Sequence, residues 1–200
     1  MKKILCFGDS NTYGFIPQNG KRYPENIRWS GILKSKLSPD YQVIEAGCNN
    51  RTGFFDNPAG KEFTGYKILP EYLKKYNPDI VITAIGINDL QFQYNASIED
   101  IKNGLDKLLN LINDKEIILL SPSVIKNNIL NSFFAQMFDE TSIQKSFNLA
   151  EIYQKAAEKY NAKYINLNEI VTPSDIDGLH YEPQAHSKIA DKIIKVLKIL

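Results

Sequence analysis

The amino-acid sequence predicts an α/β domain with three layers, in which a doubly wound, five-stranded parallel sheet lies between two layers of helices. Two observations lead to this fold class. Short apolar runs rich in β-branched and aromatic residues recur along the chain, and they alternate with segments whose apolar residues have helical spacing. Strands that alternate with helices build parallel βαβ units with right-handed crossovers. A flavodoxin-like strand order is therefore expected.

Five strands are predicted, each a short run typical of a buried parallel sheet. They span Ile4–Phe7, Gln42–Ala46, Asp79–Ile85, Glu116–Leu120 and Lys163–Leu167. The five predicted helices span Arg28–Leu37, Tyr66–Tyr76, Ser97–Asn113, Ser142–Tyr160 and Pro183–Leu200. Pro70 interrupts the second helix, whereas Ser97 and Asp100 give the third helix the spacing of a capping box.

Composition narrows the class of protein. The chain has 200 residues, of which 43% are hydrophobic and 24% are charged, and its net charge is +1. These values are ordinary for a soluble globular domain, and no repeat or linker divides residues 1–200 into two domains. The near-neutral charge argues against nucleic acid as a partner, and no segment approaches the roughly 18 apolar residues of a membrane span. Cys6 and Cys48 suit a reducing compartment, so a cytoplasmic location is expected.

Ser10 lies where the first predicted strand passes into a helix, just after the turn-forming Gly8. In an open α/β sheet, a side chain at this point projects into the crevice at the carboxyl ends of the strands. The helix N-terminus also favours developing negative charge there. Ser10 is therefore a candidate nucleophile, although a plain helix N-cap explains a serine here equally well.

Two other strand ends carry groups that can donate hydrogen bonds without bearing charge. Gly47 follows the second strand, and Asn88 follows the third. With the expected strand order, the N–H groups of Ser10 and Gly47 and the Asn88 side chain could converge on one oxyanion. The alternative is that Gly47 and Asn88 serve ordinary turns.

The chain contains two histidines, and they differ in their surroundings. His180 follows Asp177 across a glycine-containing turn, so the carboxylate can hold Nδ1–H and leave Nε2 free to accept a serine proton. His186 lies within the last predicted helix and is interpreted as a structural or surface histidine. The residue types of Asp177, His180 and His186 would permit a metal site, but their spacing does not favour one.

Two long segments break the alternation of strands and helices. Residues 49–65 follow the second strand, and residues 122–141 follow the fourth. Insertions at the carboxyl ends of strands are often binding loops. The second segment is rich in apolar side chains, which could line an acyl pocket, form a lid, make a subunit contact or only cover the core.

Four blocks occur together in a characteristic order: Gly8-Asp9-Ser10, Gly47, Gly86-x-Asn88-Asp89 and Asp177-x-x-His180. In these blocks the chain resembles the SGNH hydrolases, or GDSL esterase/lipase family, over essentially its whole length. The resemblance implies the SGNH hydrolase fold, with Ser10 as nucleophile, His180 as base and Asp177 as the orienting acid. It also implies an oxyanion hole formed by Ser10, Gly47 and Asn88, and no metal or cofactor.

Further stretches resemble the small bacterial arylesterase/acyltransferase branch of that family, namely Gly8–Phe15, Arg28-Trp29, Arg51-Thr52 and Asn88-Asp89-Leu90. Members of that branch assemble into oligomers, so a homo-oligomer is expected. Asn11 departs from the Leu or Ile common in relatives, which makes the site more polar. Asp9 and Asp89 are interpreted as fixing turns and loops, and Arg51 as forming a structural salt bridge or loop hydrogen bond.

The expected function is that of a serine esterase that hydrolyses or transfers short acyl groups, acetyl foremost, from small-molecule or carbohydrate esters through an acyl-enzyme. A lysophospholipase or thioesterase would use the same residues. A flavodoxin-like binding module is the alternative outside enzymes, although the first turn lacks the G-x-G-x-x-G run and the lysine of a phosphate-binding loop. A catalytically inactive relative is disfavoured because all four blocks are intact.

Overall fold

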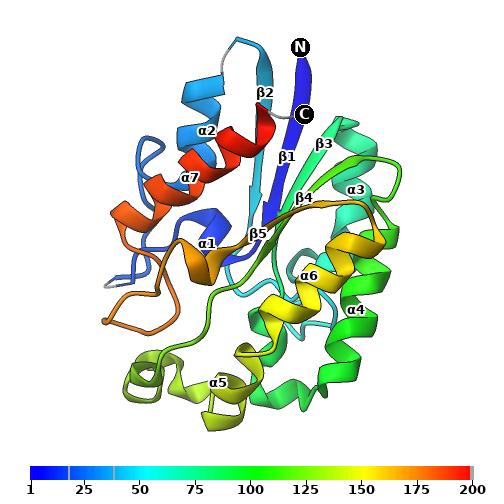
Figure 1. Cartoon of the computed structure of the whole chain (residues 1–200). Coiled ribbons are helices and arrows are strands. Elements are labelled where there is room, and N and C mark those ends of the chain that lie inside the picture. Colours follow the sequence, from blue (N-terminus) through cyan, green and yellow to red (C-terminus); the bar gives the residue numbers. More distant parts are fainter. Residues whose placement is uncertain (18, 38, 199–200) are drawn as a thin grey trace.

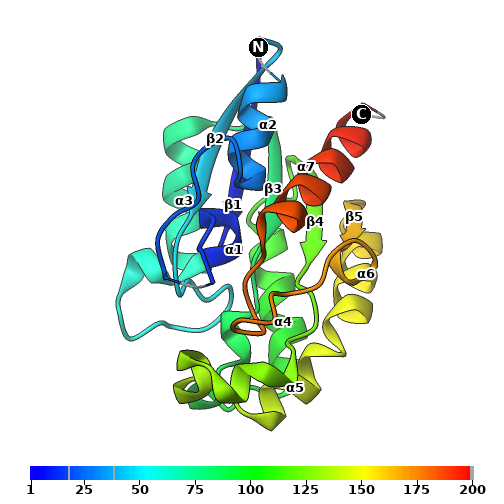
Figure 2. The ribbon, with the colours of Figure 1, turned by 90° about the vertical axis from the view of Figure 1, so that its left-hand side faces the viewer.

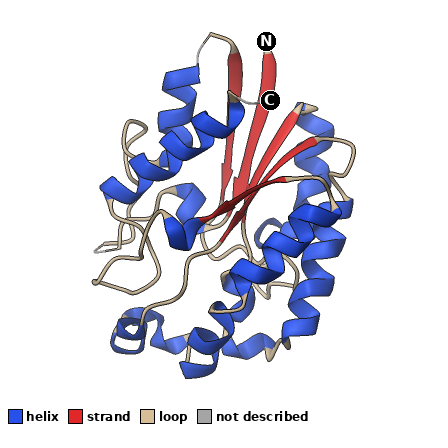
Figure 3. Cartoon of the chain, in the orientation of Figure 1, coloured by secondary structure: helices blue, strands red, loops and turns tan. Residues whose placement is uncertain are grey.

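A computed structural model describes residues 1–17, 19–37 and 39–198 of the chain. Its five strands form one parallel sheet in the order β2-β1-β3-β4-β5 (Figures 1 and 3). The strands are β1 (Lys2–Gly8), β2 (Tyr41–Gly47), β3 (Ile80–Ala84), β4 (Glu116–Ser121) and β5 (Lys163–Asn166). The predicted fold class and flavodoxin-like strand order are confirmed, with strand ends shifted by at most two residues.

The strand order reverses direction next to β1. From β1 the chain crosses to β2 at the edge of the sheet and then returns past β1 to β3. Gly8 at the end of β1 is in register with Gly47 of β2 and with Ala84 of β3. The segments that follow these three strands therefore begin side by side, at the point where open α/β sheets bind ligands.

Helices cover both faces of the sheet (Figure 1). One layer contains α1 (Ser10–Tyr13), α2 (Trp29–Leu37) and α7 (Pro183–Leu197), and the other contains α3 (Gly65–Tyr76), α4 (Ile98–Asn110) and α6 (Leu149–Lys159). In the turned view of Figure 2, α7 lies in front of the sheet and α4 lies behind it. The sheet is thus buried on both sides, which explains why its strands read as unbroken apolar runs.

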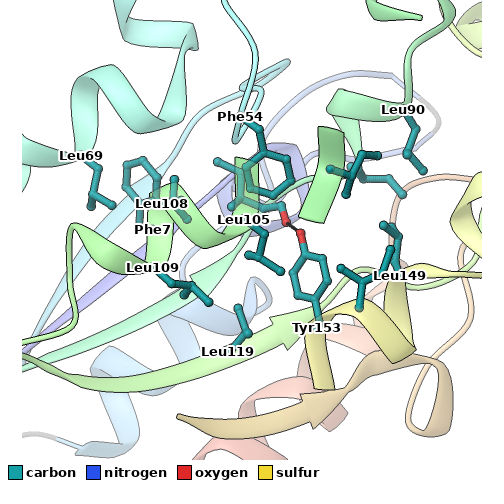
Figure 4. Close-up of a cluster of buried hydrophobic side chains, with 14 of the residues drawn as sticks. Phe7, Phe54, Leu69, Leu90, Leu105, Leu108, Leu109, Leu119, Leu149 and Tyr153 are labelled. Carbon is teal, nitrogen blue, oxygen red and sulfur yellow. Dashed lines mark hydrogen bonds between the residues drawn. The ribbon is translucent and has the colours of Figure 1, made fainter. Parts of the chain in front are cut away.

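Successive strand residues point to opposite faces, and β1 shows this clearly. Ile4 and Cys6 belong to the core cluster under α2 and α7, whereas Leu5 and Phe7 belong to the larger cluster under α3, α4 and α6. Figure 4 shows part of the larger cluster, including Phe7 and Tyr153. The Tyr153 hydroxyl, at the centre of this apolar cluster, donates a hydrogen bond to the Ile85 carbonyl. Its burial is therefore compensated.

The helix predicted over Ser142–Tyr160 is wrong as a single element. The structure has α5 (Glu140–Ser146) and then α6, with a break at Phe147 and Asn148. Asp139 caps α5 in a capping box with Ser142. The helical apolar spacing continues through the break, but α6 packs on β4, β5 and α4, whereas α5 packs on short 3₁₀ turns below the sheet. The chain changes direction to satisfy both contacts, which periodicity alone cannot show.

The other helices agree with the predictions except near their ends. The capping box of Ser97 and Asp100 is confirmed at the start of α4. The predicted interruption at Pro70 is wrong, because helix α3 continues through this residue. The predicted end of the last helix, residues 199–200, lies outside the described residues. Within the described residues, no helix has both the length and the apolar character needed to cross a membrane. The cytoplasmic location stays a prediction.

Candidate active site

The turn between β1 and α1 presents the Ser10 hydroxyl. The N-cap of α1 is Asp9, whose Oδ1 accepts a hydrogen bond from Asn11 N–H at 2.9 Å. Ser10 is instead the first helical residue, so its interpretation as a plain N-cap is wrong. A Cβ on Gly8 would lie 2.1 Å from Thr12 Oγ1 and 2.3 Å from the Ala84 carbonyl oxygen. Only glycine fits this close passage of β1 past β3.

Ser10, His180 and Asp177 form a continuous chain of hydrogen bonds. Ser10 Oγ lies 2.9 Å from His180 Nε2, and His180 Nδ1 lies 2.7 Å from Asp177 Oδ2. The second carboxylate oxygen accepts the backbone N–H groups of Leu179 at 3.0 Å and His180 at 2.9 Å. The carboxylate therefore fixes both the imidazole and the loop that carries it.

The surroundings of Asp177 favour its charged form. Burial acts to raise the pKa of its carboxyl, but the hydrogen bonds and charge of His180 and the backbone N–H of Leu179 together hold that pKa below its usual value. An ionised carboxylate only accepts hydrogen bonds, so His180 Nδ1 carries the proton that joins them. His180 Nε2 is then the unprotonated nitrogen that can accept the proton of the Ser10 hydroxyl.

A cavity of about 130 Å³ opens beside Ser10 and His180. Its other lining residues are Phe15, Asn49, Asn50, Asn88, Phe134, Met137 and Leu179. Both long segments identified in the sequence contribute to this lining. Of the apolar residues in 122–141, Phe134 and Met137 reach the cavity, whereas Ile129 and Phe138 are buried in the core. That segment thus both lines a pocket and covers the core.

Asn88 is held in one orientation by its neighbours. Its Nδ2 donates to the Arg51 carbonyl at 3.0 Å, and its Oδ1 accepts from Gln91 Nε2 at 3.1 Å. Gln91 Nε2 also donates to Asn50 Oδ1 at 2.8 Å. One of the two hydrogens on Asn88 Nδ2 therefore remains for a ligand. Sequence reasoning missed Gln91, because only the fold shows that it links two cavity residues.

Asp89 holds the loop after β2 against the end of β3. Its carboxylate accepts the backbone N–H groups of Gly53 at 2.6 Å, Phe54 at 2.8 Å and Phe55 at 3.1 Å. Burial raises the pKa of this carboxyl to about 7. The interpretation of Asp9 as a turn-fixing residue and of Asp89 as a loop-fixing residue is confirmed.

Gly47 does not line the cavity beside Ser10. A Cβ on Gly47 would lie 2.2 Å from the Tyr13 nitrogen, so this glycine permits close packing of β2 on α1. It borders a separate hollow that also contains Cys48 and Tyr72. Asn50 lines the cavity instead, with a left-handed φ of 57°. Gly47, expected from the sequence as an oxyanion donor, thus lies outside the cavity that Ser10, Asn50 and Asn88 line.

Arg51 serves the loop rather than the cavity. Its side chain is buried and donates to the carbonyl oxygens of Ala46 at 2.5 Å, Gly8 at 3.1 Å and Glu62 at 3.1 Å. These bonds tie the ends of β1 and β2 together. The interpretation of Arg51 as a residue with structural hydrogen bonds is confirmed.

His186 is a packed structural residue, as interpreted from the sequence. It is fully buried in α7, and its Nδ1 accepts the Trp29 N–H at 3.4 Å. The Tyr23 and Tyr181 rings make T-shaped contacts with its imidazole, at interplanar angles of 74° and 85°. Burial, helped by the charge of His180, lowers the pKa of the His186 imidazole to about 4. In the described part of the chain, no group of three or more His, Cys, Asp and Glu side chains could hold a metal ion.

A buried chain of serine, histidine and aspartate at the carboxyl edge of a parallel α/β sheet is the arrangement of a serine hydrolase. Residues 6–188 match the family model for the GDSL-like lipase/acylhydrolase family. The chain therefore belongs to this family, the SGNH hydrolases, and is a carboxylic ester hydrolase.

Individual relatives agree with this assignment. An arylesterase from Vibrio mimicus is 25% identical over 206 residues, which cover 98% of this chain and 88% of the relative. The native aryl esterase of M. smegmatis is 25% identical, with a TM-score of 0.90 over the whole of both chains. A carbohydrate acetylesterase family member from Sinorhizobium meliloti is 26% identical, with a TM-score of 0.91 over 100% of this chain and 98% of that one.

The buried His186 should make stability depend on pH. Because its folded pKa of about 4 lies below the unfolded value of about 6.5, the unfolded chain binds a proton first as the pH falls. The free energy of unfolding should therefore drop by about 3 kcal/mol between pH 6.5 and 4 from this group. In His186→Asn this loss should be absent, measured as the difference between urea-unfolding series of the two proteins across that pH range. Parallel curves for the variant and the wild type would contradict the assignment.

Proposed function

We propose that this esterase removes short acyl groups from esters through an acyl-enzyme on Ser10, with His180 as general base and Asp177 as its orienting carboxylate. The observation that carries the proposal is the continuous chain of hydrogen bonds from Ser10 Oγ through the imidazole to Asp177, at 2.9 Å and 2.7 Å. A nucleophile, a base and a group that orients the base are the parts that nucleophilic catalysis by serine needs.

The reaction begins when Ser10 Oγ attacks the ester carbonyl carbon and gives its proton to His180 Nε2. The π electron pair of the carbonyl moves to its oxygen, and Asp177 stabilises the imidazolium that forms. When the intermediate collapses, the carbon–oxygen bond to the alcohol breaks and His180 gives the proton to the departing oxygen. Water or an acceptor alcohol, deprotonated by His180, then attacks the acyl-enzyme and releases Ser10.

Three donors are proposed for the oxyanion of the intermediate. Two are those expected from the sequence, Ser10 N–H and the free hydrogen of Asn88 Nδ2. We assign the third to the backbone N–H of Asn50 in place of Gly47, because Asn50 lines the cavity and Gly47 does not. Within the described part of the chain, no hydrogen bond occupies the N–H of Ser10 or of Asn50. Neutral donors fixed in advance stabilise charge that appears in the transition state.

The size and lining of the cavity support a short acyl group. Its volume of about 130 Å³ is smaller than the roughly 300–1,000 Å³ of pockets that enclose drug-sized ligands. Acetyl fits this space better than the long chains that lysophospholipases cleave. Phe134 and Met137 offer an apolar wall, whereas Asn49 and Asn50 offer carboxamides that suit an alcohol bearing hydroxyl groups. Esters of both aryl alcohols and sugars are therefore candidate substrates, and both substrate types are named for relatives.

The remaining expectations about partners have not changed. Homo-oligomer formation stays a prediction, and so does the absence of nucleic acid among the partners. Membership in the hydrolase family favours the esterase over the flavodoxin-like binding module.

Replacing the nucleophile tests the proposed function directly. Ser10→Ala removes the attacking oxygen, so kcat on phenyl acetate should fall by several orders of magnitude, as in other triad knockouts. Ser187→Ala, at an exposed position of α7, is the matched control and should keep the wild-type rate. A folded Ser10→Ala protein with the full wild-type rate would reject the mechanism.

Removing the side-chain donor tests the oxyanion assignment. Asn88→Ala should lower kcat by roughly 10²–10³, with a smaller change in KM, because the lost bond strengthens only in the transition state. Asn113→Ala changes an exposed asparagine that does not line the cavity, so it controls for the substitution itself. A loss in Asn88→Ala confined to KM would show that Asn88 binds the ground state instead.

A further inference from the structure

Two phenyl rings from distant parts of the chain contact the imidazole of His180. Phe15 stacks on it with ring centroids 4.1 Å apart and an interplanar angle of 27°. Phe134 lies 5.0 Å from it at 54°, and the two phenyl centroids are 5.9 Å apart. These separations form a compact triangle, so Phe134 lies beside Phe15 rather than on the opposite face of the imidazole. Phe15 is thus the ring that stacks on an imidazole face.

The turn that presents the nucleophile also positions Phe15. Helix α1 ends at Tyr13, and its C-cap Gly14 has a left-handed φ of 88°. The next residue, Phe15, donates its N–H to the Ser10 carbonyl at 3.0 Å and forms a β-bridge with Arg22. The phenyl ring is therefore held by the same backbone that holds Ser10. Stacking joins this turn to the loop of His180 by a second contact besides the Ser10–His180 hydrogen bond.

We propose that Phe15 is a positioning residue for His180, an inference that rests on the proposed function. Its ring keeps the imidazole in the orientation that joins Ser10 Oγ to Asp177 Oδ2, and its π-face stabilises the imidazolium. A phenyl face attracts a cation through its quadrupole, and it attracts a neutral ring less. Because the imidazolium forms as Ser10 loses its proton, this attraction is greater in the transition state than in the ground state. It should therefore raise kcat rather than only tighten binding.

Few other charges act on this ring. Asp177, on the same loop, is the ionised group in contact with it. His186 of α7 couples with it electrostatically and is buried in its neutral form. The turn brings the Ser10 hydroxyl and the Phe15 ring against the imidazole, and the segment of Phe134 brings a second phenyl ring. Asp9, the buried N-cap of the same turn, is a further titratable group nearby, and it is unchanged when Phe15 is replaced. A change in the proton affinity of the His180 imidazole on replacing Phe15 can therefore be assigned to the loss of the aromatic face.

The test compares Phe15→Leu, which stays apolar but loses the π-face, with Phe15→Tyr, which keeps it. Because the chain has only two histidines, proton NMR resolves two imidazole titrations, and His186→Asn identifies that of His180. In Phe15→Leu the titration midpoint of His180 should fall by about 0.3 to 1.5 pH units, and kcat by about 2- to 30-fold with little change in KM. Phe15→Tyr should restore both.

Met137→Leu changes the same cavity without touching the imidazole stack, so it should leave the His180 midpoint at the wild-type value. A wild-type midpoint in folded Phe15→Leu, or an equal drop in Phe15→Tyr, would overturn the proposal. The NMR reading does not require esterase activity. Failure of the Phe15 proposal in this NMR test is therefore distinct from failure of the proposed function, which an active Ser10→Ala variant would reveal.

Discussion

One hydrogen bond, between Ser10 Oγ and His180 Nε2, joins residues that are 170 positions apart in the chain. It forms because the turn after β1 and the loop before α7 open at the same carboxyl edge of the sheet. Two partly buried hydrogen bonds support it: Asn11 Nδ2 donates to the Leu179 carbonyl, and Trp29 Nε1 donates to the Asn11 carbonyl. The separation of base and nucleophile is therefore set by β1, α1 and α2 and not by a loop alone. Such fixed geometry is what proximity effects in catalysis require.

Three aspartates of the four sequence blocks are buried, and their surroundings give them different roles. Burial raises the pKa of Asp9 and of Asp89 to about 7, and both accept backbone N–H groups that shape the turns around the site. Asp177 instead has a pKa below its usual value, because His180 and backbone N–H groups outweigh the cost of burial. Only Asp177 is therefore secured as an anion beside the imidazole. Environment rather than residue type separates the orienting carboxylate from the structural ones.

The sequence was sufficient for the sheet, because strands buried on both faces leave continuous apolar runs that periodicity detects. It also predicted that Ser10, Asp177 and His180, at a strand end and in a tight turn, would lie together, and hydrogen bonds join them. The sequence-based predictions were wrong where tertiary packing determines the local structure. The break at Phe147 depends on which neighbours α5 and α6 cover, and the cavity position of Asn50 depends on a left-handed turn after β2. No local sequence signal marks the break at Phe147 strongly enough to outweigh the continuous helical spacing. Likewise, no local signal marks Asn50 as strongly as the nearby Gly47 marks its own position.

In the proposed mechanism His180 activates the hydroxyl of Ser10. Labelling with a fluorophosphonate, followed by mass spectrometry of peptides, tests it most directly, because this reagent needs a serine whose proton is removed by a neighbouring base. We expect one adduct on the peptide that contains Ser10, and none in a folded His180→Ala variant. An adduct on another serine, or equal labelling of Ser10 without His180, would contradict it.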